Sequence, residues 1–319
     1  MELDKNSFET AENIILAIRK KNKTLSTYNQ KSLRKQALFF SPLYRDFIAK
    51  IISSSSLSIK LSHNDGYCSP SYSLDRSSTL NKRVKVEVNA DIDALYTLPH
   101  ELGHAVDFFF GYDKSLSSNV LLSSNMTLQE AFSLEFSSKK EEIYKEVMNE
   151  YKSIMDVSIG KNAFDIITSN IHLYRKLKTI PLYNRDITET KIRKELQNHL
   201  EEIGFVECYY RLFKSRCFDF LNLKYSPILD ALSSVYDLSY LFLEGHGKDY
   251  YKNKEGLEVQ EFFANLFLAK VASQYVQFDS LIKLLPKSFK AFEELFFLFY
   301  NRLMGKKTFL DINLTKKER

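Results

Sequence analysis

The chain has 319 residues, of which 44% are hydrophobic and 27% charged, as in an ordinary globular protein long enough for one large or two moderate domains. Its net charge of +5 comes from 45 basic and 40 acidic residues along the whole chain, which is too diffuse to indicate nucleic-acid binding. The three cysteines, Cys68, Cys208 and Cys217, lack metal-site spacing and predict reduced thiols rather than a disulfide framework.

The sequence predicts neither of two common targeting segments. Residues 1–23 carry acidic side chains early and only a short apolar stretch, unlike a Sec signal peptide. No window approaches the roughly 18 consecutive apolar residues of a transmembrane segment. We therefore expect a protein that is cytoplasmic in the producing cell. Export without a Sec signal, for example into a host cell, stays compatible with the sequence, and no oligomeric state is predicted.

The first third of the chain combines helices with two strands. Apolar residues three or four apart predict helices at 8–20 and 32–51, and we expect Pro42 to break or kink the second. At 57–61 and 84–88 apolar residues alternate with polar ones, which is typical of strands. Because turn-type residues lie between them, we expect a small antiparallel sheet.

The rest of the chain is predicted to be almost entirely helical. Helical periodicity recurs with charged outer faces, and the aromatic stripes within it are expected to be core. The predicted helices lie at 127–154, 162–178, 190–222, 228–243, 257–275 and 279–303. The fold class is therefore mainly α with one small antiparallel β-sheet.

The segment HELGH at 100–104 has the HExxH pattern of zinc hydrolases. His100 and His104 are four residues apart, so on a helix their imidazoles lie on one face and can share one Zn²⁺ ion. Glu101 then lies beside the metal and can act as general base when water attacks a carbonyl group. The motif therefore predicts a hydrolase with one zinc ion.

A catalytic zinc needs a third protein ligand and one open position. The metzincin extension would place Gly at position 107 and His at 110, but this chain has Asp107 and Phe110, so that class is excluded. The remaining histidines are His63, His172, His199 and His246. His172 and His199 stand singly on helical stretches and are expected to be structural or exposed. The alternative is a glutamate from a later helix, and the candidates are Glu130, Glu135, Glu258 and Glu261.

Three segments resemble the peptidase domain of the anthrax lethal factor family. HELGHAVD at 100–107 is similar to its H-E-F-G-H-A-V-D, and EFFANLF at 261–267 to its E-F-F-A-E-A-F. The segment 284–292 is similar to the proline-containing stretch before that domain's last helix. A GHGxxYY-like segment, here at 245–251, precedes the ligand segment in phage-associated HExxH domains. The resemblance covers about 85–112 and 243–300.

This resemblance implies a zincin-like α+β metallopeptidase fold with Glu261 as the third zinc ligand. The family's catalytic tyrosine lies seven residues before that glutamate, where this chain has Lys254. Tyr250 and Tyr251 are the nearest tyrosines, and either could take the role, the alternative being that both only pack. Lys254 could offer a cation to the oxyanion instead.

Two further residues could orient a zinc-bound imidazole by accepting its second N–H. Asp107 lies one turn past His104, and Asn265 lies one turn past Glu261. Asn265 replaces a glutamate of the lethal factor pattern, and an amide oxygen is the weaker acceptor. For Asp107 a solvated carboxylate is the alternative.

The gap of 157 residues from His104 to Glu261 is much longer than in lethal factor, so we expect a large helical insertion. The insertion is expected to shape the cleft or to dock the target. The predicted regions are an N-terminal helical part (1–56), the sheet with the HExxH helix (57–112), the insertion (113–240), the ligand-glutamate helix with the C-terminal helix (241–304) and a basic tail (305–319).

The function that these patterns predict is a zinc-dependent endopeptidase that cuts a specific protein, as toxins and secreted effectors of the lethal factor type do. One alternative is an intracellular regulatory metallopeptidase, but in those the ligand glutamate lies much closer to HExxH. Another is a binding module that keeps the zinc fold without activity, and the intact Glu101 argues against it. The expected partner is a protein or peptide substrate.

Overall fold

The computed structural model is mainly helical. It describes residues 5–21, 33–35, 37–55, 57–62, 84–89, 97–109, 116–158, 216–236, 248–252, 256–272 and 279–305. The chain forms two compact units, one of residues 1–136 and 259–319 and the other of residues 137–258. The predicted insertion, 113–240, overlaps the second unit, while residues 116–136 belong to the first. Within the described ranges, no helix combines the length and apolar character needed to cross a bilayer.

The elements follow the predicted order along the chain. They are α1 (Lys5–Lys21), η1 (Pro42–Tyr44), α3 (Arg45–Ser53), β1 (Leu57–Ser62), β2 (Val84–Asn89), α4 (Thr97–Phe109), η3 (Ser117–Asn119), α5 (Leu128–Ser158), α10 (Arg216–Tyr236), α11 (Lys248–Tyr251), α12 (Leu257–Ala272), α13 (Asp279–Leu284) and α14 (Pro286–Leu303). The predicted helix at 162–178 lies outside the described residues.

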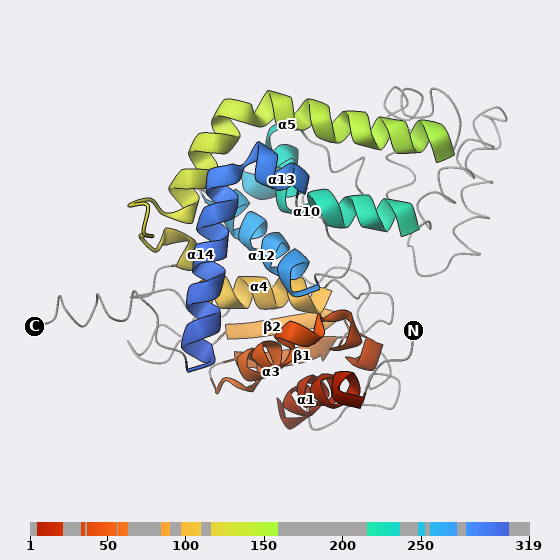
Figure 1. Ribbon diagram of the computed structural model, residues 1–319, viewed down its shortest axis with the longest axis vertical. Coiled ribbons are helices and arrows are strands. Elements are labelled where there is room, and N and C mark those ends of the chain that lie inside the picture. The colour runs from red at the N-terminus through yellow and green to blue at the C-terminus, as the bar shows by residue number, and fades with distance from the viewer. Residues whose placement is uncertain are drawn as a thin grey trace, which may run out of the picture. The chain divides into compact units, whose positions relative to one another are not determined.

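The two strands pair in parallel, so the predicted antiparallel arrangement is wrong. Leu57 lies opposite Val84, and the register continues to Ser62 opposite Asn89. A parallel pair needs a crossover of a dozen or more residues, and the connection 63–83 is long enough. Turn-type residues in that connection favoured a hairpin, but alternation alone does not fix strand direction. In Figure 1, α4 lies along β2, and α3 and α1 lie on the side of β1.

Helix α12 forms the centre of the first unit. Every residue from 261 to 269 is buried, so this helix is packed on all sides. Three aromatic rings from three helices meet beside it at centroid distances of 5.7 to 6.3 Å: Phe47 of α3, Phe267 of α12 and Phe296 of α14. Of the aromatic stripe of α14, Phe292, Phe296 and Phe299 are core, as predicted from their spacing. Phe289 and Tyr300 are only partly buried.

Two prolines end helices where proline chemistry requires it. Pro42 begins the short helix η1, and α3 starts at Arg45, so the helix predicted at 32–51 is broken there. The helix predicted at 279–303 is also broken, because Pro286 is the first residue of α14. Proline lacks the N–H that a continuing helix needs, and it disfavours helical geometry at the residue before it, here Leu285.

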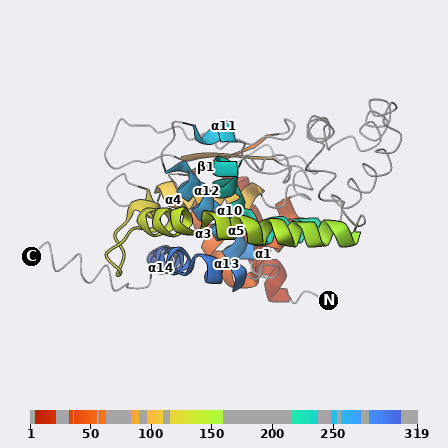
Figure 2. The same cartoon turned by 90° about the horizontal axis from the view of Figure 1, so that it is seen from above.

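The second unit pairs α5 with α10 through tyrosine and glutamate side chains. Near one end, Tyr236 of α10 donates a hydrogen bond to Glu141 of α5 at 2.5 Å, and near the other Tyr225 donates one to Glu150. The two helices therefore run antiparallel, and they lie side by side in both views (Figure 1, Figure 2). Helix α10 continues through Pro227, so the predicted break between 222 and 228 does not occur.

Candidate metal centre

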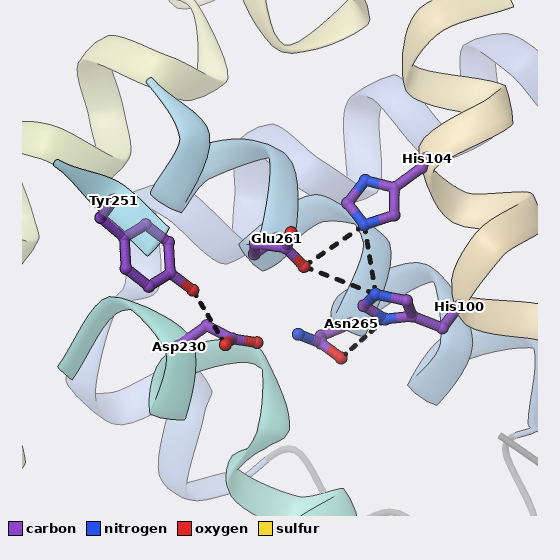
Figure 3. A network of polar contacts seen from close by, with 6 residues as sticks. All are labelled: His100, His104, Asp230, Tyr251, Glu261 and Asn265. Carbon is purple, nitrogen blue, oxygen red and sulfur yellow. Dashed lines mark hydrogen bonds and ion pairs between the residues drawn. The ribbon is translucent and has the colours of Figure 1, made fainter. Parts of the chain in front are cut away.

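Helix α4 presents the two histidines of HELGH on one face. The rings of His100 and His104 lie edge to face, with centroids 4.7 Å apart and Nε2 atoms 3.1 Å apart. This follows from the four-residue spacing, which stacks side chains one helical turn apart. Both Nε2 atoms point to the same place, which is where α12 crosses α4 (Figure 3).

Glu261 of α12 completes the group. Its Oε2 lies 3.4 Å from Nε2 of His100 and 3.3 Å from Nε2 of His104. His100, His104 and Glu261 form a group that could hold a metal ion, and we call it the metal group. It is the one such group among the described residues. Glu261 and His104 are buried, at 1% and 4% side-chain exposure, whereas His100 is 21% exposed and opens the group to solvent.

The charge state of Glu261 suits a ligand. Burial alone would raise the pKa of this carboxyl, but the charges of His104 and His100 and their hydrogen bonds outweigh it and hold the pKa well below its ordinary range. Beside charged imidazoles Glu261 is therefore held as an anion. An anionic oxygen beside two imidazole nitrogens is a donor set typical of catalytic zinc.

Asn265 fixes the tautomer of His100. The amide oxygen of Asn265 lies 3.0 Å from Nδ1 of His100, and a carbonyl oxygen can only accept. Nδ1 therefore carries the hydrogen, and in the neutral ring Nε2 keeps its lone pair toward Glu261. That is the tautomer a metal ligand needs, and metal-binding histidines are commonly oriented in this way.

Glu101 is a buried carboxylate next to the group. It is 3% exposed, and no described residue forms a hydrogen bond with its Oε2. Burial raises the pKa of Glu101, the charges of His100 and His104 partly offset this, and that of Glu261 adds to it. A buried carboxylate oxygen without a protein partner is costly, so a functional reason is expected for it.

Asp107 does not occupy the position expected for a solvated carboxylate. It is 1% exposed, and its Oδ1 accepts a hydrogen bond from the backbone N–H of Ser118 at 2.8 Å. Ser117 Oγ donates to the carbonyl of Val106 one residue earlier, at 3.4 Å. Asp107 therefore ties helix α4 to the turn η3 that follows it.

Three of the four glutamates considered as ligands lie outside the metal group. Glu130 forms a reciprocal cap with Thr127 at the start of α5: its Oε2 accepts from the Thr127 N–H at 2.7 Å, and its own N–H donates to Thr127 Oγ1 at 3.1 Å. Glu135 accepts the N–H groups of Lys287 and Ser288 at 2.9 and 2.8 Å and so caps α14. Glu258 is in the first turn of α12, outside the group.

The predicted tyrosine pair lies on helix α11 in the second unit. The rings of Tyr250 and Tyr251 meet edge to face at 5.1 Å. Tyr251 is buried, and its O–H donates to Oδ1 of Asp230 on α10 at 2.8 Å (Figure 3). Asp230 was not singled out from the sequence, because no local pattern links residues on two different helices. Lys254 lies outside the described residues, as do His63, His172, His199 and His246.

No protein-family model, curated protein or solved structure matches this chain. The resemblance to lethal factor-like peptidases therefore stays an expectation that depends on three short segments. Two of them, HELGHAVD and EFFANLF, contain the three residues of the metal group.

Proposed function

We propose that this chain is a zinc-dependent endopeptidase of the zincin-like type. In it His100, His104 and Glu261 hold one zinc ion, and Glu101 is the general base. The observation that carries the proposal is the group of three converging ligand atoms with a buried carboxylate next to them.

The donor set and its spacing fit zinc. Zinc in catalytic sites is held tetrahedrally by three protein ligands at about 2.0–2.2 Å, and two such ligands lie about 3.3 Å apart. The separations between the three ligand atoms here are 3.1, 3.4 and 3.3 Å. Calcium and magnesium prefer shells of oxygen ligands, so two imidazole nitrogens argue against them.

The residues of this chain can divide the work of hydrolysis. Zinc, when bound, supplies a Lewis acid that polarises a carbonyl group and lowers the pKa of water to about 7. Glu101 takes the proton of the attacking water and returns it to the leaving amine. A carboxylate can serve as the general base of such a step, and Glu101 is buried beside the group with no hydrogen bond to its Oε2 from any described residue.

The peptide bond as substrate comes from the resemblance to lethal factor-like peptidases. It is supported by the way the two similar segments fall on α4 and α12, which supply all three members of the metal group. A toxin or secreted effector with one protein target is the form of this function that we propose.

The test compares the wild-type chain with Glu101→Gln. Metal content is measured by mass spectrometry, and cleavage is measured on a peptide library and on a cell extract whose new N-termini are sequenced. We expect one zinc per chain in both proteins and a loss of turnover of roughly 10²–10⁴-fold in Glu101→Gln, because general-base catalysis contributes about that much. Zinc without any cleavage would favour a binding module, and a chain that takes up no zinc would overturn the proposal.

A further inference from the structure

Helices α4 and α12 touch through backbone atoms at one point, where Gly103 meets Ala264. A Cβ atom placed on Gly103 would lie 2.7 Å from Ala264 Cα, 2.9 Å from Ala264 O and 3.1 Å from Phe267 Cβ. Real Cβ atoms essentially never approach another atom within 3.0 Å. Because two of the three neighbours are backbone atoms, no side-chain rotation could relieve the clash. Only glycine lets the two helices come this close.

This contact lies in the middle of the metal group. Each helix contributes two side chains that are four residues apart. One lies three residues before the small residue of its helix, and the other lies one residue after it. Both pairs therefore lie on the face that meets the other helix. The pairs are His100 and His104 about Gly103, and Glu261 and Asn265 about Ala264. The separation of the helices at this point therefore decides whether Glu261 reaches both imidazoles.

We propose that Gly103 and Ala264 are positioning residues whose backbone contact sets the distance between the third ligand and the histidine pair. The inference depends on the metal centre proposed above and adds what holds its geometry. It predicts that the ligand atoms are held in place before metal binds, because the helices bring them together.

The shift that a side chain on Gly103 would require is larger than a metal site can absorb. Ordinary van der Waals contact begins at 3.4 Å, so a methyl group on Gly103 requires an increase of 0.7 Å from the present 2.7 Å. Metal–ligand distances in well-formed sites lie within about 0.2 Å of their usual values. Glu261 has little freedom to follow, because it is 1% exposed and the residues of α12 around it are buried. Moving α12 away from α4 therefore separates the ligands by more than the site can absorb.

The test is Gly103→Ala in the full chain, with Val271→Ala as the matched control. Val271 is also buried on α12 but lies two helical turns, about 10 Å, past Ala264, so shortening it disturbs the core away from the contact with Gly103. Zinc affinity is measured by competition with a chelator, and the visible spectrum of the cobalt-loaded protein reports coordination geometry. We expect zinc affinity at least tenfold lower in Gly103→Ala, with loss of the intense four-coordinate cobalt bands. We expect Val271→Ala to stay within threefold of wild type.

The outcomes separate this inference from the proposed function. If wild type binds no zinc, the metal centre itself is wrong. If wild type binds zinc and folded Gly103→Ala binds it within threefold, the positioning role is wrong, and equal losses in Gly103→Ala and Val271→Ala overturn it too. If Gly103→Ala does not fold, Ala264→Ser adds a hydroxyl group to the residue that Gly103 contacts and is judged by the same thresholds.

Discussion

The amide oxygen of Asn265 accepts the Nδ1 hydrogen of His100 at 3.0 Å and thereby turns the lone pair of Nε2 toward Glu261. The contact joins the two helices that form the metal group. It also explains how an asparagine can stand where the lethal factor pattern has a glutamate, since either side chain offers an oxygen acceptor.

Asn265→Leu is therefore expected to weaken zinc binding by about 10–100-fold, the usual cost of losing the partner that orients a metal-binding histidine. Leucine keeps the branched shape of the side chain and replaces the amide oxygen and nitrogen by methyl groups, so together with the Asn265→Asp control the loss reports the acceptor. Asn265→Asp is the control, because it keeps the oxygen and adds charge, and it should bind zinc at least as tightly as wild type. Chelator competition measures both, and a wild-type affinity in Asn265→Leu would show that the contact does not orient the ligand.

Glu261→Ala is expected to lower the zinc content of the purified chain sharply, whereas Glu258→Ala, Glu130→Ala and Glu135→Ala keep it. The reason is that Glu261 alone among these glutamates belongs to the metal group. Glu135→Ala has a different effect, because it leaves two N–H groups at the start of α14 without their carboxylate. The free energy of unfolding, measured in urea, should fall by about 1–3 kcal/mol. An unchanged zinc-to-protein ratio in Glu261→Ala would refute the ligand assignment.

Asp107 is expected to make the metal-free protein less stable as the pH rises. Burial raises the pKa of Asp107 to about 6, although hydrogen bonds from Ser118 act in the opposite direction, and the unfolded value is about 3.9. The folded state therefore holds the proton more tightly, and the free energy of unfolding falls between about pH 4 and pH 6. At about 1.4 kcal/mol per pKa unit, the loss from pH 4.5 to pH 7.5 is about 2 kcal/mol.

The comparison of wild type with Asp107→Asn isolates this contribution, because the other titrating groups are common to both proteins. Asparagine can still accept from the Ser118 N–H and carries no charge. Urea unfolding with a chelator present, at pH 4.5 and 7.5, should show Asp107→Asn gaining about 2 kcal/mol relative to wild type at the higher pH. A difference between the two proteins that does not change with pH would contradict the expectation.

The sequence could predict features that depend on residues close together in the chain, but not contacts between residues far apart in it. The HELGH spacing is set within one helical turn, so the convergence of His100 and His104 could be expected from five residues. The cap between Thr127 and Glu130 is equally local. Glu135 caps Ser288 across 153 residues, and no sequence pattern spans such a distance.

Strand direction and the surroundings of Asp107 were missed for the same reason. Alternation placed both strands correctly but says nothing of the path between them, so the parallel pairing of Leu57 with Val84 could not be read. Asp107 has the helical position of a site residue, yet its carboxylate is bound by Ser118, which comes after the helix has ended. Gly103 could be recognised as small, but not as the point where α12 approaches, because its partner Ala264 lies far along the chain.

The hydrogen bond of Tyr251 makes Tyr250 the stronger candidate of the two tyrosines for supporting an oxyanion. Its O–H is directed to Asp230, and both side chains are buried in the second unit. Tyr251→Phe would leave that carboxylate short of a donor, and we expect it to lower stability by about 1–3 kcal/mol. Tyr250 is half-buried and is the better candidate for supporting an oxyanion.

Tyr250→Phe should therefore lower kcat by at least about tenfold with little change in zinc content, since losing an oxyanion donor costs up to about 10²–10³-fold. Phenylalanine keeps the ring that packs against Tyr251, so only the donor is removed. Lys254→Ala is expected to be milder. The measurements are kcat on a cleaved peptide, zinc content and the midpoint of thermal unfolding for each variant. A large loss of kcat in Tyr251→Phe at unchanged stability would move the role to Tyr251, and wild-type turnover in both Phe variants would show that neither tyrosine supports the oxyanion.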